Sequence, residues 1–306
     1  MKTVTLTNPR PRSRQGGAAL LIAMLIVVLG LVTLLTFRGD HKGPELEAER
    51  KTALALAQAK EALLGRAATH TSGGSPRPGI LPCPDTHARG SFNEGIADSN
   101  CNANAIGRLP WRTLGLPDLG EGAYGRLWYK LSVNFQGNVS VKVNTASTGT
   151  LSVGGGPMLA AIVFAPGASL GGQVRDNANY NNFLAYLEGY ANAGDTNFNS
   201  APGSPINDRL ITILPNEIKN MIVPLVAEDV RISLDGYSPP PAYPASFPAP
   251  SEWISTNGWL PSLISYQQLT NATAQLDFSA GGCPTVYQYR WDVGLNRTVM
   301  TRNGKC

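Results

Sequence analysis

The chain has 306 residues, of which 42% are apolar and only 15% are charged, and it contains 33 glycines and 23 prolines. This composition favours a loop-rich exported domain over a helical cytosolic enzyme. The formal net charge of +4 comes from the first 17 residues, which hold four basic residues and no acid, while the remaining 21 basic residues balance 21 acidic ones. The charge distribution therefore excludes a polyanion-binding surface, and we expect no nucleic-acid partner.

Residues 18–37, AALLIAMLIVVLGLVTLLTF, form a run of twenty uncharged residues behind the basic leader, residues 1–17. A helix of this length spans the hydrocarbon core of a bilayer. The run is too long for the apolar region of an ordinary secretory signal, and no small-residue cleavage site follows it. Because basic residues stay in the cytoplasm, we expect a transmembrane helix with the C-terminal bulk of the chain outside.

The junction between leader and apolar run reads Arg14-Gln15-Gly16-Gly17-Ala18. This order resembles the signal of type IV prepilins, the family of type IV pilins and of the pseudopilins of type II secretion. The resemblance implies that a prepilin peptidase cuts between Gly17 and Ala18 and that Ala18 becomes N-methylated. The alternative is a plain signal-anchor helix preceded by two glycines.

The fifth residue after the expected cut is Ile22, where most members of this family carry Glu. In the family that carboxylate neutralises the N-terminal amine of a neighbouring subunit inside the filament. Its absence there marks certain minor subunits, notably those at the filament tip, so Ile22 favours a minor subunit.

Residues 38–70 follow the apolar run and show apolar positions at steps of three and four, which predicts an amphipathic helix. Gly39, Gly43 and Pro44 loosen its beginning. We interpret residues 38–70 as the periplasmic half of a pilin spine, residues 71–78 as a linker, and residues 79–306 as a globular periplasmic domain.

The globular region is predicted to contain strands at residues 127–135, 138–144 and 158–164 and helices at 179–190 and 217–231. A proline-rich loop is expected over residues 238–250. The predicted fold class is therefore α+β, with a long N-terminal hydrophobic helix, the pilin spine, followed by a loop-rich, mostly antiparallel β domain with a few helices.

Five blocks of the globular region resemble blocks of large bacterial pilin-like proteins, and we interpret them as structural, with Pro and Gly setting turns and aromatic residues packing. They are residues 79–85, 107–117, 125–129, 163–167 and 207–210.

Four cysteines are predicted to form disulfides, because an even count is typical of an exported domain. Three connectivities are possible, and pairing neighbours along the chain closes the shortest loops, each worth about 3 kcal/mol. Zinc is the competing interpretation, but the three histidines do not supply a close ligand cluster. The four are Cys83, Cys101, Cys283 and Cys306.

Two motifs invite a chemical interpretation. The segment 167–171 matches G-x-S-x-G, but all three histidines precede Ser169, so a hydrolase would lack its base. Asp195, Asn197 and Asn199 place oxygen atoms at alternate positions, as a calcium loop does, without the Gly and Glu of an EF-hand. A structural calcium ion is thus the one candidate cofactor, and we otherwise expect none.

The sequence predicts a non-enzymatic minor type IV pilin-like subunit of the inner membrane, with its C-terminal domain in the periplasm. The subunit is then expected to assemble into a pilus or pseudopilus, or at the tip of one. The expected partners are prepilin peptidase, the inner-membrane assembly platform, and other pilins or pseudopilins through the N-terminal helix. The alternatives are a membrane-anchored adhesin or binding module and, less favoured, a periplasmic enzyme.

Overall fold

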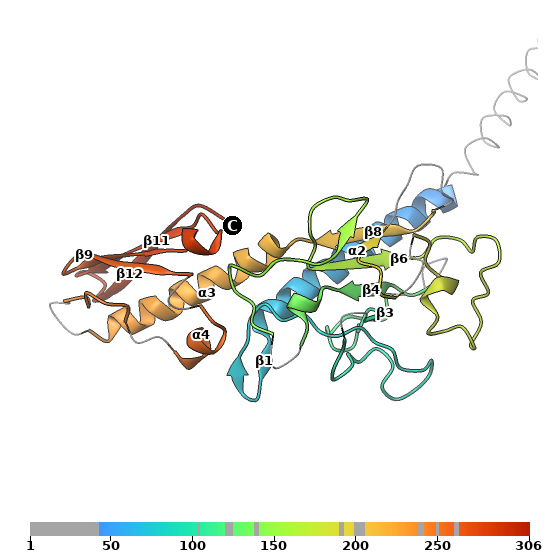
Figure 1. Cartoon of the computed structure of the whole chain (residues 1–306), viewed down its shortest axis with the longest axis horizontal. Coiled ribbons are helices and arrows are strands. Elements are labelled where there is room, and N and C mark those ends of the chain that lie inside the picture. Colours follow the sequence, from blue (N-terminus) through green and yellow to red (C-terminus); the bar gives the residue numbers. More distant parts are fainter. Residues whose placement is uncertain are drawn as a thin grey trace, which may run out of the picture. The chain divides into compact units, whose positions relative to one another are not determined.

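The computed structural model describes residues 43–102, 105–119, 125–137, 141–189, 193–198, 206–237, 242–248, 251–259 and 263–306. Among these residues are twelve strands and three α-helices, labelled α2 to α4 in Figure 1. Lys51–Cys306 forms one compact unit, and the boundary with the preceding unit, Met1–Arg50, falls inside α2.

The predicted fold class, α+β with a long N-terminal hydrophobic helix, is wrong for the part of the chain that the structure describes. Strands outnumber helices there by twelve to three, so the described fold is mostly β. None of these three helices is both long and apolar enough to cross a membrane. The apolar run at 18–37 and the cleavage junction at Gly17 and Ala18 lie outside the described residues.

Helix α2 spans Gly43–Thr69 and begins where Gly43 and Pro44 were expected to loosen the chain. Proline is tolerated in a first turn because the backbone N–H groups there have no partner within the helix. The segment expected as a linker, 71–78, contains the small antiparallel hairpin of β1 (Thr71–Ser72) and β2 (Ser75–Pro76). The C-terminal half of α2 is buried along one side through Leu56, Ala59, Leu63, Leu64 and Ala67.

The central sheet has four antiparallel strands in the order β3-β4-β6-β8. Strand β6 is buried throughout because both faces of the sheet are covered, which explains its uninterrupted apolar sequence. On one face Val163 joins the main core, and on the other Phe164 joins a smaller second core. The strands are β3 (Ile106–Arg108), β4 (Trp128–Leu131), β6 (Ala161–Ala165) and β8 (Arg209–Ile213).

The C-terminal sheet is an antiparallel meander in the order β12-β11-β10-β9. Its strands are β9 (Ser265–Thr270), β10 (Thr273–Asp277), β11 (Val286–Asp292) and β12 (Arg297–Asn303). Under it, Phe278 packs edge-on against Trp259 and Tyr287, with ring centroids 6.0 Å apart in both pairs. Such edge-to-face pairs add about 0.5–1.5 kcal/mol each to the burial of the rings.

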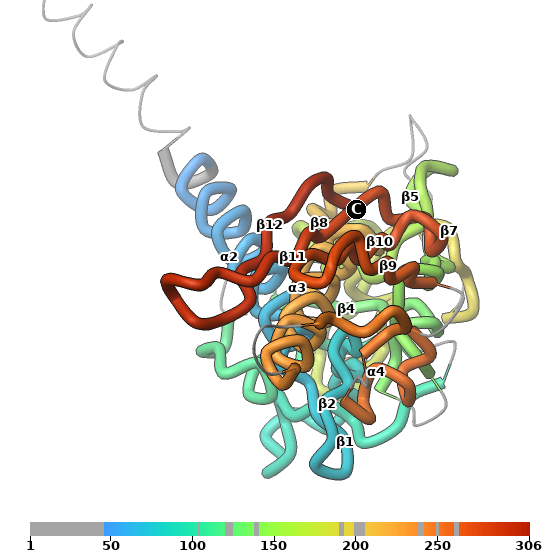
Figure 2. Tube along the Cα trace, turned by 90° about the vertical axis from the view of Figure 1, so that its left-hand side faces the viewer, coloured from blue at the N-terminus to red at the C-terminus, as the bar shows by residue number. Residues whose placement is uncertain are grey.

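Helix α3 (Pro215–Asp235) lies directly after β8 and packs against β12 (Figure 1 and Figure 2). Its apolar positions recur at three- and four-residue steps, which places them on one buried face. Seven of its side chains are fully buried in the main core, and the six Val, Ile and Leu side chains among them are each worth about 1.5–3 kcal/mol of transfer free energy. The seven are Ile218, Ile222, Val223, Val226, Ala227, Val230 and Leu234.

The remaining elements are short and join loops to these layers. The parallel pair β5 (Ser152–Val153) and β7 (Asn197–Phe198) lies outside the central sheet. Helix α4 spans Glu252–Thr256, and 3₁₀ turns occupy Val133–Phe135, Phe183–Ala185 and Ser279–Gly281.

The helix predicted over residues 179–190 is reduced to the 3₁₀ turn at Phe183–Ala185. Its Asn182 side chain accepts the backbone N–H of Leu184 at 3.3 Å. Short polar side chains of this kind compete with helical hydrogen bonds, so an apolar spacing that fits a helix does not secure one.

Gly79 tests the packing of α3 against the chain that leaves α2. It has a φ of +96°, and a Cβ atom there would lie 2.5 Å from both Ile222 and Val143. We predict that Gly79→Ala lowers the free energy of unfolding by about 2–4 kcal/mol, because strain and overpacking add. Gly73→Ala, at φ +59° with open space around it, should cost only about 1 kcal/mol. Denaturant unfolding of both variants measures the difference, and equal losses would contradict this packing.

Candidate functional site

The main polar cluster of the described residues is built around Asp85, whose side chain is only 1% exposed. The backbones of Asp85 and Arg108 bond each other twice, N–H to carbonyl, at 2.9 Å. The Asp85 carboxylate accepts the backbone N–H of His87 and of Gly95, both at 2.8 Å. It also lies 3.7 Å from the buried Arg108 guanidinium. Asp85 thus closes the start of its loop onto the end of β3.

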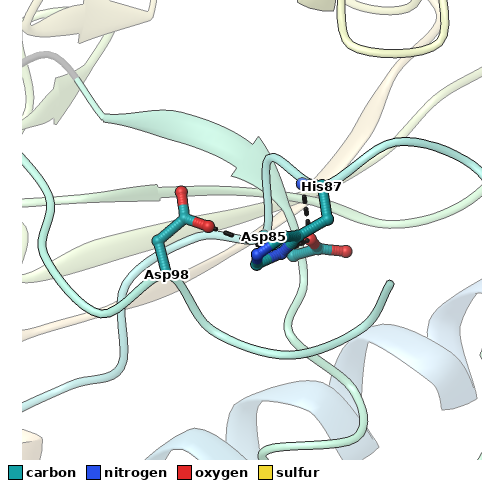
Figure 3. A group of neighbouring side chains, drawn as sticks. All are labelled: Asp85, His87 and Asp98. Atoms are coloured by element: carbon teal, nitrogen blue, oxygen red, sulfur yellow. Dashed lines mark hydrogen bonds and ion pairs between the residues drawn. The ribbon is translucent and has the colours of Figure 1, made fainter. Parts of the chain in front are cut away.

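His87 lies between two carboxylates, as Figure 3 shows. Its Nδ1 is 2.9 Å from Asp85 Oδ1 and 3.5 Å from Asp98 Oδ1. Asp98 in turn accepts the Thr86 hydroxyl at 2.6 Å. Asp85 and Asp98, from different parts of the loop, thus lie against the same histidine nitrogen.

This trio has the side-chain types of a metal site, with one ligand atom from each residue within 4.8 Å of the others. Cations prefer carboxylate oxygens that are free to turn toward them. Both Asp85 oxygens, however, are already held by backbone N–H groups from His87 and Gly95. The contacts of the trio therefore fit a loop-holding role better than a metal-binding one.

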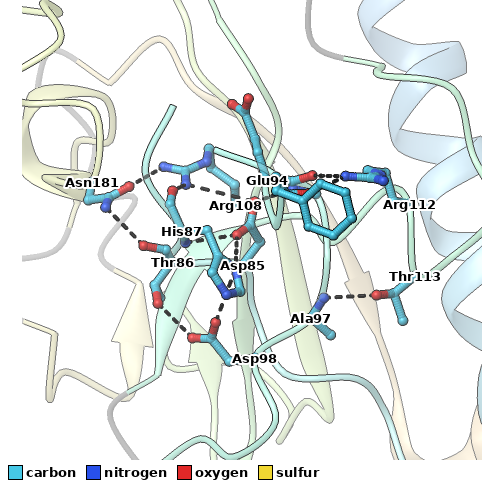
Figure 4. Close-up of polar contacts among 12 residues, drawn as sticks. Asp85, Thr86, His87, Glu94, Ala97, Asp98, Arg108, Arg112, Thr113 and Asn181 are labelled. Carbon is cyan, nitrogen blue, oxygen red and sulfur yellow. Dashed lines mark hydrogen bonds and ion pairs between the residues drawn. The ribbon is translucent and has the colours of Figure 1, made fainter. Parts of the chain in front are cut away.

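Arg108 connects the trio to the loop that carries Tyr180. Its guanidinium lies 3.8 Å from the centroid of the Tyr180 ring and donates to the Tyr180 carbonyl at 3.0 Å. It also donates to Asn181 Oδ1 at 2.5 Å and to the carbonyl of His87 (Figure 4). Burial lowers the pKa of Arg108, and the neighbouring Tyr180 and Asp85 partly offset this.

Tyr180 also joins a second ionic group. Its hydroxyl and the Arg126 guanidinium both bond the Glu94 carboxylate, and Arg126 reaches Asp118 at 2.6 Å. Burial, together with the hydrogen bond to Glu94, raises the pKa of Tyr180 to about 12. Tyr180 therefore stays a neutral hydrogen-bond donor at physiological pH.

The cavity beside these groups has a volume of about 10 Å³ and is lined by Asp85, Arg108, Trp111 and Arg126, among others. That is room for about one water molecule and not for a substrate. The small cavity therefore favours a role for the cluster in holding its loop over a role in binding a substrate.

The loop is also closed covalently, because Cys83 is bonded to Cys101, with Cα atoms 5.7 Å apart. Cys283 is bonded to Cys306, with Cα atoms 4.4 Å apart. The prediction of a disulfide framework is thus confirmed, with neighbours along the chain as partners. Each closed loop, of 18 and 23 residues, contributes about 3 kcal/mol on the chain-entropy model.

The residues predicted as calcium ligands make other contacts in the structure. Asn197 Oδ1 accepts the hydroxyl of Ser152 at 2.8 Å and the N–H of Gly155 at 3.1 Å, which ties β7 to β5. Asp195 lies in the field of Lys130, a buried lysine that donates to the Ala193 carbonyl at 2.5 Å. The lysine thus supplies positive charge to this loop. Asn199 lies outside the described residues.

Burial lowers the pKa of Lys130 to about 8, against the opposing effect of Asp195.

Ser169, of the G-x-S-x-G match, donates its hydroxyl to the carbonyl of Gln173 at 2.8 Å.

The sequence analysis missed the Asp85 cluster because its partners are set by tertiary contacts. The available signal was the cysteine pair, since a bond between Cys83 and Cys101 encloses Asp85, His87 and Asp98 in one short loop. Comparison with protein-family models, with curated proteins and with solved structures finds no significant match to the chain.

We predict that Asp85→Ala lowers the free energy of unfolding by about 3–5 kcal/mol, because it leaves Arg108 buried without its carboxylate and two N–H groups without an acceptor. Asp98→Ala is the matched control. Its carboxylate is 23% exposed, so its loss should cost at most about 1 kcal/mol. Denaturant unfolding compares the two, and a larger loss for Asp98→Ala would refute the central role of Asp85.

Proposed function

We propose that this chain is a minor type IV pilin-like subunit. It is inserted in the inner membrane by its apolar segment 18–37, cut by prepilin peptidase, and assembled into or at the tip of a pilus or pseudopilus. The observation that carries the proposal is the Gly17–Ala18 junction, which stands between a basic leader and twenty uncharged residues. We propose a structural role for the subunit and no enzymatic one.

The two disulfides support export of the domain, since disulfides persist in the periplasm and outside the cell and are rare in the reducing cytosol. The neutral charge balance after residue 17 fits a domain that contacts other proteins rather than polyanions.

Two features favour a minor subunit over a repeating shaft subunit. Ile22 replaces the carboxylate that most shaft subunits of this family use to pair with a neighbour's terminal amine. The compact unit Lys51–Cys306 is also large, and a bulky domain is difficult to repeat along a closely packed shaft.

An adhesive or ligand-binding role is the alternative, and one observation favours it. Phe92, 85% exposed, stands on the disulfide-closed loop 83–101, where the Arg112 guanidinium binds its carbonyl at 2.6 Å. An aromatic side chain on a pre-ordered loop can contact a partner at low entropic cost. Phe92→Ala would then leave filaments intact and abolish attachment.

The processing step gives the direct test. With prepilin peptidase present, we predict that the intact mass of the protein falls by residues 1–17 and includes one methyl group on Ala18. Without the peptidase, the chain should keep its full length. Gly17→Val should block the cut, whereas Gly16→Val, one residue earlier, should leave it in place. A full-length chain in the presence of the peptidase, or a cut beyond residue 37, would refute the proposal.

A further inference from the structure

An open hollow of about 510 Å³ is lined by two segments, 171–174 after β6 and 179–185, which ends in the 3₁₀ turn Phe183–Ala185. Its volume lies in the range of about 300–1,000 Å³ that is typical of small-molecule sites. The eight described residues that line it carry no charge, since three bear amides, two are aliphatic and the others are glycine or alanine. The amide and aliphatic residues are Gln173, Val174, Asn179, Asn182 and Leu184.

The two walls of the hollow are tied to each other by the chain itself. The Arg175 guanidinium donates to the carbonyl of Gly167 at 2.7 Å and to the carbonyl of Ala185 at 3.0 Å. Ala185 is in turn buried in the second core. Because both walls are already ordered, a ligand would bind them at low entropic cost.

A second polar cluster, formed by Asp208 and Glu188, holds the same segments. Asp208 Oδ1 accepts the N–H of Gly167 at 3.0 Å, and its Oδ2 accepts the N–H of Glu188 at 2.8 Å. Glu188 Oε1 accepts the side-chain amide of Gln173 at 2.9 Å. The cluster thereby fixes one of the three amides that line the hollow.

The three amides keep hydrogen-bonding capacity beyond these contacts. Each amide has two N–H donors and an oxygen that accepts two bonds. Within the described part of the chain each amide nitrogen donates once, that of Asn179 to Asp176 at 2.9 Å and that of Asn182 to Asn179 Oδ1 at 3.4 Å. The oxygens of Asn179 and Asn182 each accept one bond. The hollow therefore offers both donors and acceptors to a ligand.

Uncharged donors and acceptors side by side suit hydroxyl groups, which donate and accept at the same position. An anion would only accept, and no cation is among the described residues that line the hollow. Val174 and Leu184, which are 56% and 44% exposed, present aliphatic surface to the C–H groups of a sugar ring. A neutral sugar matches both kinds of side chain.

We propose that this hollow binds an uncharged carbohydrate, a short chain of neutral sugar units, through the three amides and the two aliphatic side chains. The site is separate from the exposed Phe92. The inference does not depend on the pilin-like assignment, whose evidence lies in residues 1–37.

The test is binding of the purified full chain to an array of immobilised neutral hexoses, N-acetylhexosamines and their oligosaccharides, in a detergent without a sugar headgroup. Sialylated and sulfated glycans on the same array form the anionic arm. We expect retention of neutral glycans, with a Kd that changes little with salt, because no charge pair is formed.

Gly171→Trp should fill the hollow and abolish this binding. A Cβ atom at Gly171 meets no other atom within 4 Å, so the backbone has room for the change while the indole occupies the space of the ligand. Gly65→Trp is the matched control, at an exposed glycine of α2 with equally open surroundings. It should bind as the unaltered chain does.

Should Gly171→Trp fail to fold, Leu184→Ala supplies the test at an exposed side chain, and the lost apolar contact should weaken binding about fivefold. Four results would each overturn the proposal. They are retention of no neutral glycan, preference for the anionic arm, full binding by folded Gly171→Trp or by Leu184→Ala, and an equal loss in Gly65→Trp.

Discussion

The buried face of α3 (Pro215–Asp235) is the packing on which the other elements depend. At its start Glu217 pairs with Lys60 of α2 at 2.6 Å. One turn further, Ile222 fills the space that Gly79 leaves open. In its second half the carbonyl of Ala227 accepts the Tyr289 hydroxyl at 3.0 Å from the C-terminal sheet. Because one helix face contacts both helix and sheet partners, a change on it affects α2 and the C-terminal sheet together.

Elements whose signal is local could be predicted from the sequence, and those that depend on distant partners could not. The helix expected at 217–231 and the strand expected at 158–164 correspond to α3 and β6. Strong apolar periodicity identifies the helix, and an unbroken apolar run identifies the strand, without knowledge of the elements they pack against. The overall class was wrong because short strands in Gly- and Pro-rich segments leave a weak signal. The cluster around Asp85 escaped because its partner Arg108 is 23 positions away and its burial is a tertiary result.

The two polar clusters place constraint at different points of the same fold. Asp85 and the Cys83–Cys101 bond fix a loop whose apex, Phe92, is exposed. Asp208 and Glu188 join loops that cover the second core. In the proposed subunit, the first gives a rigid contact surface, and the second fixes the chain segments that cover the second core.

Export of the domain is the central claim, and cell topology tests it most directly. Protease and a thiol reagent are applied to intact cells and to spheroplasts that make the full chain. The account predicts that the region 79–306 is degraded in spheroplasts and protected in intact cells, and that its four cysteines react only after reduction. A region that stays protected in spheroplasts and carries four reactive thiols would contradict it.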